Sequence, residues 1–320
     1  MPQRTRLERI MFEWKPVSPF VQKNFWKYEA LRPIYISEGH YLNQFLWENY
    51  YQTRFAMDQC ALYLSIRTHG HHGAFAPLCR EEDLPAVFSR LEDEFHRHWN
   101  EPARFYNIDT TMVKILEEND LLTNYEVSPD RDSFDYIYDA DKLRTLSGKA
   151  MHKKKNLLNG FVREYEGHFE YETLGINNIE EIESFHQKWL DERRTDDKYN
   201  CLDDEEDGIY RLFGNCHSIQ CKMGGVRIDG ELKAYSIGSY VPHLKLAIIH
   251  IEKADVSYHG LYNYINQQFI LNEFPEAQLV NREDDLGQEN LRQAKLSYRP
   301  LRLEEKFSLV EKTGGSLNNL

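Results

Sequence analysis

The densest run of residues that could do chemistry is the polar segment from Asn281 to Gly287. It reads Asn-Arg-Glu-Asp-Asp-Leu-Gly and follows a short apolar stretch, Gln278 to Asn281, that is predicted to be a strand. Ligands of α/β sheets collect at strand ends, so this segment is a candidate site. A carboxylate there could take a proton from a nucleophile, and nearby donors could stabilise developing charge. The acids could equally cap the helix predicted from Gly287 to Lys295.

Individual side chains of the cluster, and of the loop ahead of the central helix, can be given candidate roles. A carboxylate can act as a general base, and a lysine or a tyrosine can donate a hydrogen bond that stabilises an oxyanion. The candidate bases are Asp255, Glu283, Asp284 and Asp285, the candidate oxyanion donors are Lys295 and Tyr298, and the candidate substrate-binding residues are Tyr258, Asn281, Arg282 and Arg292.

A second candidate is a basic run on a predicted helix in a chain whose formal net charge is −13. The run consists of Lys149, His152, Lys153, Lys154 and Lys155. Such a run could bind the phosphates of a nucleotide, a tRNA or an anionic lipid. It is equally typical of a solvated helix face toward the helix C-terminus, where positive charges are stabilised by the helix dipole. If it binds substrate, the candidate residues are Lys149, Lys153, Lys155 and the adjoining Asn156.

Composition limits the class of protein. A chain of 320 residues and 38.1 kDa is long enough for about two domains. No stretch approaches the roughly 18 apolar residues of a membrane span, and the Arg-rich start lacks the apolar core of a secretory signal. Five irregularly spaced cysteines fit reduced thiols. We therefore expect a soluble cytoplasmic protein whose acidic surface disfavours non-specific nucleic-acid binding, apart from a local basic patch.

The remaining motifs give no metal site. His69, His71 and His72 share one predicted tight turn, but without a supporting carboxylate pattern they are more typical of exposed turn residues. The sequence contains no phosphate-binding P-loop, dinucleotide fingerprint, serine-hydrolase elbow or zinc-protease motif. We assign no metal ligands.

The element that must position the candidate residues is the stretch from Met223 to Phe274. Asp229-Gly230 between two β-prone runs predicts a hairpin. Leu244 to Ile251 is apolar on both faces and predicts a central strand. The loop Glu252 to Gly260 then opens onto a helix that begins at Leu261, and helix N-termini attract anions.

Strands and helices alternate in two similar cycles of hairpin, helix, strand and helix, which predicts a duplicated α/β unit rather than one large sheet. We place the boundary near Pro129, with an N-terminal domain over residues 1–129, a C-terminal domain over residues 130–310 and a disordered tail over residues 311–320. Further expectations are a short helix from Asp109 to Glu118 that is begun by Asp109, Thr110 or Thr111, and one helix from Asp139 or Asp141 to Phe161. We also expect a solvated loop from Asp191 to Asp207 and a final strand from Arg299 to Leu309.

Several segments resemble the family of the phosphatidylglycerol lysyltransferase C-terminal domain. They are Asp135 to Asp139, Leu146 to Lys149, Lys153 to Asn156, Asn281 to Gly287 and Leu291 to Pro300. The resemblance covers most of the chain and implies an α/β (α+β) fold of two tandem GNAT-like units, each a mixed, mostly antiparallel sheet flanked by helices. Membrane-bound relatives move an aminoacyl group from charged tRNA to a lipid headgroup hydroxyl, whereas this chain looks like the stand-alone members of unknown function.

The resemblance implies an acyltransferase that passes an aminoacyl group to a hydroxyl or amine of a lipid headgroup or a small molecule. An acetyl-CoA-dependent GNAT would carry a glycine-rich loop where this chain has Val256 to Gly260 with one glycine. We therefore expect aminoacyl-tRNA rather than acetyl-CoA as donor, and assign no cofactor. The alternatives are a non-catalytic module that binds a nucleotide, amino acid or polyamine, and an acyl-CoA-dependent N-acyltransferase. Catalysis requires a carboxylate or histidine within reach of a pocket that also reaches the basic helix.

Overall fold

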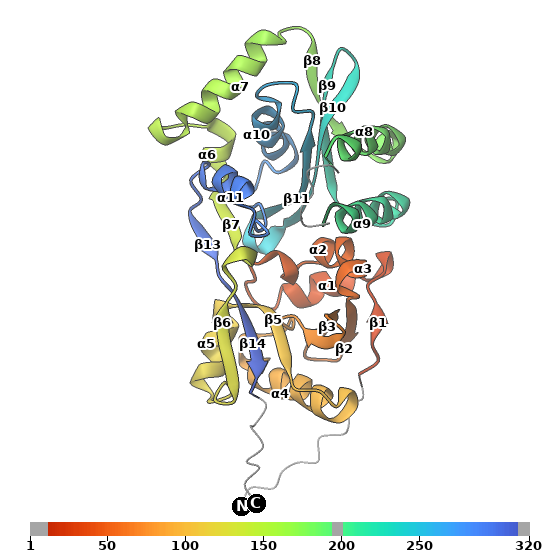
Figure 1. Ribbon diagram of the computed structural model, residues 1–320, viewed down its shortest axis with the longest axis vertical. Helices are drawn as coiled ribbons and strands as arrows, with labels where there is room; N and C mark the ends of the chain where they lie inside the picture. Colours follow the sequence, from red (N-terminus) through yellow and green to blue (C-terminus); the bar gives the residue numbers. More distant parts are fainter. Residues whose placement is uncertain (1–11, 194–200, 313–320) are drawn as a thin grey trace, which may run out of the picture.

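The computed structural model describes residues 12–193 and 201–312, and within them two seven-stranded mixed sheets follow one another along the long axis of the molecule (Figure 1). In the first sheet the spatial order is β1 (Lys15–Pro16), β2 (Arg54–Met57), β3 (Leu62–Thr68), β4 (His71–Ala74), β5 (Arg104–Asp109), β14 (Lys306–Glu311) and β6 (Tyr125–Pro129). In the second it is β8 (Phe169–Leu174), β9 (Lys222–Ile228), β10 (Glu231–Val241), β11 (Leu246–Ala254), β12 (Leu279–Asn281), β7 (Asp135–Asp139) and β13 (Arg302–Glu304).

Helices pack on both faces of each sheet, as the predicted fold class requires. Those of the first unit are α1 (Gln22–Glu29), α2 (Tyr41–Leu46), α3 (Glu48–Tyr51), α4 (Leu84–Glu94) with a π-helical turn (Phe95–Trp99), and α5 (Thr110–Glu118). Those of the second are α6 (Ala140–Thr145), α7 (His152–Glu164), α8 (Ile179–Arg193), α9 (Cys201–Asn215), α10 (Leu261–Glu273) and α11 (Glu289–Leu296).

The two sheets have the same order, and each contains one strand from the far end of the other unit. In both, the fourth and fifth strands are parallel, β4 with β5 and β11 with β12. The sixth place is taken by β14 in the first sheet and by β7 in the second. Since β7 follows β6 along the chain and β14 follows β13, each unit gives its last strand to the other sheet. Figure 1 shows β14, in blue, between the yellow strands of the first unit.

The apolar core continues across the junction of the two units. One cluster of buried side chains includes Phe25 and Phe45 of the first unit together with Ile209, Phe213 and Tyr235 of the second. The two units therefore share a core as well as strands.

Several local sequence signals are confirmed. Asp229 and Gly230 adopt φ values of 50° and 83°, and the hairpin they close pairs β9 with β10. Asp109 caps α5 by accepting a hydrogen bond from the Met112 N–H at 3.1 Å. The predicted central strand is β11, which is buried along most of its length between β10 and β12.

Other expectations are wrong. The helix predicted to run through Phe161 is broken, because Leu146 and Gly148 have φ values of 45° and 89° and α7 begins only at His152. Residues 201–207 belong to α9 rather than to a loop, and residues 194–200 lie outside the described ranges. The predicted final strand is two strands, β13 and β14, in different sheets. The domain boundary near Pro129 stays a proposal. Strand β14 follows this boundary along the chain but pairs within the first sheet, so the boundary does not assign every strand to the sheet of its own domain.

Candidate functional site

The candidate site lies where β11 and β12 part. The two strands pair from Leu246 with Leu279 to Ile248 with Asn281, and there the pairing ends. After Asn281 the chain continues to hydrogen-bond to β7, since the Arg282 N–H donates to the Tyr136 carbonyl at 3.1 Å. The carboxyl-terminal part of β11 and the predicted polar segment therefore diverge, and polar side chains bridge them.

Two bridges cross this divergence. Arg282 donates to Glu252 Oε1 at 3.0 Å, and His250 Nδ1 lies 2.8 Å from Glu283 Oε1. Glu252 also accepts from Asn266 of α10 at 2.9 Å. Two polar side chains of β11 are thus held against two consecutive residues of the predicted cluster.

Tyr298 lies beside the first bridge. Its hydroxyl accepts a hydrogen bond from Asn263 Nδ2 at 2.5 Å, and the Arg282 guanidinium lies 5.0 Å from its ring centroid. Burial raises the pKa of Tyr298 to about 12, although the positive charge of Arg282 opposes the shift. The hydroxyl therefore keeps its proton at neutral pH and can donate it. We refer to Glu252, Asn263, Asn266, Arg282 and Tyr298, together with Lys154, as the β11–β12 cluster.

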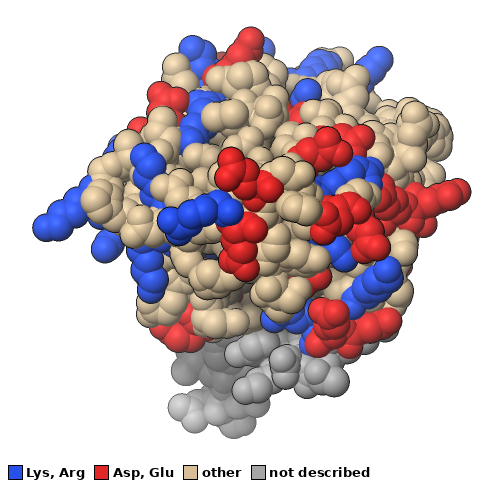
Figure 2. Space-filling view, turned by 90° about the horizontal axis from the view of Figure 1, so that it is seen from above, with Lys and Arg blue, Asp and Glu red and all other residues tan. Residues whose placement is uncertain are grey.

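Lys154 is the residue of the basic run that reaches this cluster. Its ammonium lies 4.3 Å from the Tyr298 ring centroid, and burial, with the nearby charge of Arg282, lowers its pKa. The four predicted substrate-binding residues of the run, in contrast, are exposed: Lys149, Lys153, Lys155 and Asn156. Lys149 lies in a 3-10 turn before α7, not on the helix. In Figure 2, basic residues project on the left, the side on which Figure 1 places α7, and acidic residues gather across the centre and right.

Helix α7 also packs on the loop that leads into α10. Gly260, with a φ of 89°, lies so close that an added Cβ would be 2.4 Å from the Leu157 carbonyl oxygen. Tyr258 packs against Tyr165 with 5.3 Å between ring centroids. Asp255 closes the loop by accepting from the Ser257 N–H and hydroxyl, at 2.9 and 2.6 Å. The N-terminus of α10 is thus covered by α7.

Asp285 is fully buried within the fold. It accepts hydrogen bonds from Arg131, Arg292, the Tyr136 hydroxyl and the Gly287 N–H. Burial alone would raise its pKa, but the hydrogen bonds from Arg292, Tyr136 and the Gly287 N–H lower it. These contacts are those of a structural anchor, and a catalytic role for Asp285 or Arg292 stays a prediction.

Asp284 has the opposite environment. Burial raises its pKa to about 6, and the charge of Asp135 adds to the shift while Lys306 opposes it. Lys295 donates to the main-chain carbonyls of Arg282 at 2.6 Å and of Asp284, and burial lowers its pKa. Lys295 therefore holds the polar segment in place, and its role as an oxyanion donor is likewise untested.

Asn281 and Glu283 connect the segment to the first unit. Asn281 Nδ2 donates to the Tyr35 carbonyl at 2.8 Å and to Asp135 at 2.7 Å. Glu283 accepts from Asn43 Nδ2 of α2 at 3.1 Å as well as contacting His250. Of the four predicted bases, Glu283 contacts a histidine, and a carboxylate paired with a histidine is typical of acid–base sites.

Sequence reasoning missed His250 and the inward position of Lys154, and it expected Glu252 as a polar candidate in the loop ahead of the central helix rather than in β11. His250 had a usable signal, since it is the polar residue in the apolar run of β11. Which lysine faces inward depends on how α7 lies on α10, and the run of lysines does not contain that information.

Beneath the segment, a buried ionic cluster joins the two units. The Lys306 ammonium lies 2.7 Å from both Glu38 and Asp135, and the side chain of Lys306 is fully buried. Burial raises the pKa of Glu38 to about 7, with Asp135 adding to the shift and Lys306 opposing it. We refer to Glu38, Asp135, Asp284 and Lys306 as the junction cluster.

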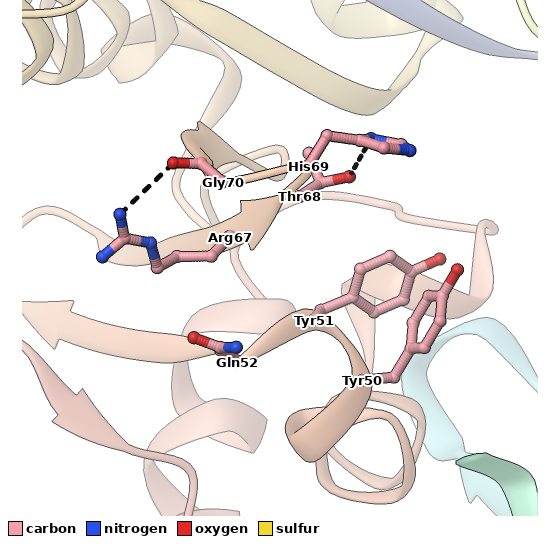
Figure 3. Close-up of a pocket in the computed structure, with 7 residues that line it drawn as sticks. All are labelled: Tyr50, Tyr51, Gln52, Arg67, Thr68, His69 and Gly70. Atoms are coloured by element: carbon pink, nitrogen blue, oxygen red, sulfur yellow. Dashed lines mark hydrogen bonds between the residues drawn. The ribbon is translucent and has the colours of Figure 1, made fainter. Parts of the chain in front are cut away.

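A cavity of about 280 Å³ opens on the first unit, away from the β11–β12 cluster. Its lining consists of Tyr50, Tyr51, Gln52, Arg67, Thr68, His69 and Gly70, none of which is a predicted site residue (Figure 3). The hydroxyls of the two tyrosines point the same way in Figure 3. Burial raises the pKa of Tyr51, and the charges of Glu38 and Asp284, two residues of the junction cluster, add to the shift.

No group of three or more histidine, cysteine or acidic side chains in residues 12–193 and 201–312 is arranged to hold a metal ion. His71 and His72 instead approach Glu101, at 3.4 and 2.9 Å. None of the helices in the same ranges combines the length and the apolar character that a membrane crossing requires.

Comparison with known proteins identifies similar chains. The family model described as phosphatidylglycerol lysyltransferase, C-terminal, matches residues 30–310. An uncharacterized protein of Mycoplasmoides gallisepticum is 26% identical over 173 residues, which are 52% of this chain and 53% of the relative, so the match spans about half the length of that protein.

Solved structures share the fold. A conserved protein of unknown function from Bacteroides thetaiotaomicron has a TM-score of 0.87 and 25% identity, over 94% of this chain and 100% of that one. L-PGS from Bacillus licheniformis has a TM-score of 0.67 and 14% identity, over 96% of both chains. A tandem GNAT protein from the clavulanic acid biosynthesis pathway has a TM-score of 0.50 and 9% identity, over 95% of this chain and 99% of that one. The predicted fold of two tandem GNAT-like units is confirmed.

Proposed function

Because the chain belongs to the phosphatidylglycerol lysyltransferase C-terminal family, an acyltransferase family, we propose that it transfers an aminoacyl group from aminoacyl-tRNA to a hydroxyl or amine acceptor. The acceptor is a lipid headgroup or a small molecule. The observation that carries the proposal is the β11–β12 cluster, where an inward lysine of α7 meets a protonated tyrosine and a bridging arginine.

Each side chain has a part in that chemistry. Attack on an ester carbonyl places negative charge on its oxygen, and a preorganised donor stabilises that charge. Tyr298 suits this part because Asn263 donates to its hydroxyl oxygen, which leaves the phenolic proton free to point at substrate. Arg282 and Lys154 are the cations nearest to Tyr298 and would hold a phosphate of the tRNA end or the developing oxyanion. The exposed Lys153 and Lys155 would contact tRNA phosphates farther out.

The covered N-terminus of α10 supports tRNA over coenzyme A as donor. A pyrophosphate bound at a helix N-terminus needs open main-chain N–H groups. Here α7 packs against Gly260, and Asp255 accepts from the Ser257 N–H. An acyl-CoA-dependent enzyme would have to move α7 to use this end of the helix.

The test is transfer from tRNAs charged with radiolabelled amino acids, with anionic lipid vesicles and small amines as acceptors. We expect salt-sensitive tRNA binding and labelled product. Lys153→Ala with Lys155→Ala should weaken tRNA binding and reduce its salt dependence. Lys154→Ala should lower the turnover number at saturating tRNA at least tenfold.

Lys114→Ala is the matched control, because Lys114 is an exposed helix lysine of the first unit that pairs with Glu118. It should behave as wild type. Binding of acetyl-CoA without tRNA would replace the proposal by the acyl-CoA-dependent reaction. Binding of neither would leave the alternative of a non-catalytic module for a nucleotide, amino acid or polyamine.

A further inference from the structure

Three side chains from separate segments form a hydrogen-bonded series beside the β11–β12 cluster. Ser239 of β10 lies with its Oγ 2.8 Å from His250 Nε2, and His250 Nδ1 lies 2.8 Å from Glu283 Oε1. A nucleophile within reach of a base that a third group orients is the diagnostic arrangement of nucleophilic catalysis. The series is independent of the residues that place Tyr298 and Lys154.

The direction of the hydrogen bonds follows from the partners. An ionised carboxylate only accepts, so the proton of the neutral imidazole sits on Nδ1 and points to Glu283. Nε2 is then an acceptor, and the Ser239 hydroxyl donates to it. This is the tautomer that a general base needs, since its free lone pair faces the nucleophile's proton.

The fold holds the base rigidly and leaves the serine accessible. In the pairing of β10 with β11, Ile237 faces Ile251 and Gly238 faces Ile249, so His250 is the extra residue of a bulge. Bulges re-aim side chains next to active sites. The His250 side chain is 1% exposed, whereas Ser239 is half-buried.

Glu283 is itself fixed from two directions. Its N–H donates to Asn281 Oδ1 at 2.6 Å, with a φ of 54°. Its carboxylate accepts from Asn43, which belongs to the other unit. The orientation of His250 therefore depends on contacts from both units.

We propose that Ser239 is the nucleophile of an acyl transfer that proceeds through an acyl-serine, with His250 as its general base and Glu283 as a positioning residue. The inference rests on the proposed function for its substrate class, a carboxylic ester of the aminoacyl type. Ser239 Oγ bonds to the ester carbonyl carbon while its proton passes to His250 Nε2. The ester C–O bond then breaks, and the leaving alcohol takes that proton. In the second half the acceptor attacks the acyl-serine and gives its proton to His250. The bond between Ser239 and the acyl group then breaks, and Ser239 takes that proton from His250 to become the hydroxyl again.

A fluorophosphonate probe tests the nucleophile without any tRNA. Its phosphorus bonds to an activated serine oxygen with loss of fluoride. We expect one adduct per chain, mapped to Ser239 by peptide mass spectrometry, and none in Ser239→Ala. His250→Gln should lower the labelling rate at least a hundredfold while its melting temperature shows that it folds. Ser133→Ala is the control, since Ser133 is a half-buried serine that donates to a carboxylate, Asp130, at 2.6 Å, and its labelling should match wild type.

The positioning role has its own readout. Glu283→Gln should slow labelling at least tenfold at unchanged melting temperature, and Glu283→Asp should regain part of the rate, which a purely structural residue would not produce. Absence of an adduct, an adduct at another serine, or full aminoacyl transfer by Ser239→Ala would overturn the inference. A protein that labels at Ser239 through His250 but accepts no aminoacyl-tRNA keeps the nucleophile and refutes only the proposed donor.

Discussion

Two neighbouring aspartates show how local contacts separate side chains that look alike in the sequence. Asp285 accepts from two arginines, a tyrosine hydroxyl and an N–H, whereas the Asp284 carboxylate accepts from the Leu286 N–H at 3.2 Å. The first is stabilised as a carboxylate and the second is destabilised by burial. Their contributions to stability should therefore differ.

At pH 7, Asp285→Ala should lower the free energy of unfolding by about 3 kcal/mol, because it leaves partly buried cations without their partner. Asp284→Ala should change it by less than about 1 kcal/mol, because the fold disfavours the charge that is removed. Since the pKa of Asp285 is lowered, its contribution is present above its ordinary pKa and is lost as the pH falls through the lowered value. Denaturant unfolding of both variants measures this, and equal losses would contradict it.

At this scale the sequence identifies residue types but not their partners. The segment Asn281 to Gly287 does gather at a strand end, as the pattern of a polar run after an apolar strand predicts. Arg131 and Tyr136, which lie about 150 positions earlier, decide which of its aspartates is held by an ion pair and a tyrosine hydroxyl. Ser239 and His250 come into contact because of a β-bulge, and no residue type in the sequence predicts that bulge.

Helix α7 is the element on which the candidate site depends, because it brings Lys154 to Tyr298. Its distance from α10 is set at Gly260, where a positive φ coincides with a close approach to Leu157. A glycine is required there both for its conformation and for its lack of a side chain.

Gly260→Ala should therefore destabilise the protein by more than strain alone. A left-handed conformation costs a residue with a side chain about 1–2 kcal/mol, and overpacking against a main-chain carbonyl adds about 1–3 kcal/mol. Gly167→Ala is the matched control, because Gly167 has a φ of 81° and no atom within 4 Å of an added Cβ. Thermal melting compares the stability of the two variants. An equal loss of stability would show that α7 moves away from the added methyl group at little cost.

Elements with strong local signals could be predicted, and those that depend on distant contacts could not. The Asp229-Gly230 hairpin and the cap at Asp109 use the conformational preferences of their own residues. The break between α6 and α7 requires a left-handed Leu146, which leucine rarely adopts, so its sequence suggested one continuous helix. α9 was missed because its first turns carry acids rather than apolar residues.

The whole molecule is held together at its junction, and the pairing of β14 with β5 and β6 is the part that local patterns could least predict. Partners some 200 positions apart leave no periodic signal. The consequence is electrostatic as well as topological, because the incoming strand carries Lys306 into a site with three carboxyl groups, those of Glu38, Asp135 and Asp284. Burial raises the pKa values of Glu38 and Asp284, and the charge of Asp135 adds to both shifts because one cation does not balance three carboxylates.

Stability should consequently fall as this cluster loses protons. An acid whose pKa is raised in the fold binds more protons folded than unfolded between its ordinary and raised values, so the free energy of unfolding decreases as the pH rises through that window. From pH 5 to pH 8 the wild type should lose about 2 kcal/mol more than Glu38→Gln, given a pKa of about 7 for Glu38. Glu118→Gln, on the exposed face of α5, should follow the wild type. Denaturant unfolding at both pH values measures the difference, and parallel losses in all three proteins would contradict the cluster's role.

The packing of the two units leads to the last prediction. Gly208 of α9 lies so close to α2 that an added Cβ would be 2.1 Å from the Leu46 carbonyl oxygen, whereas Gly214 of the same helix has no atom within 4 Å. Gly214→Ala should stabilise the protein by about 0.5–1 kcal/mol through helix propensity, and Gly208→Ala should destabilise it by about 1–3 kcal/mol through overpacking. Because the sheets exchange strands, the loosened variant should still unfold in one transition, followed by circular dichroism and by tryptophan fluorescence. Two transitions in Gly208→Ala would mean that shared packing, rather than the exchanged strands, makes the units one cooperative structure.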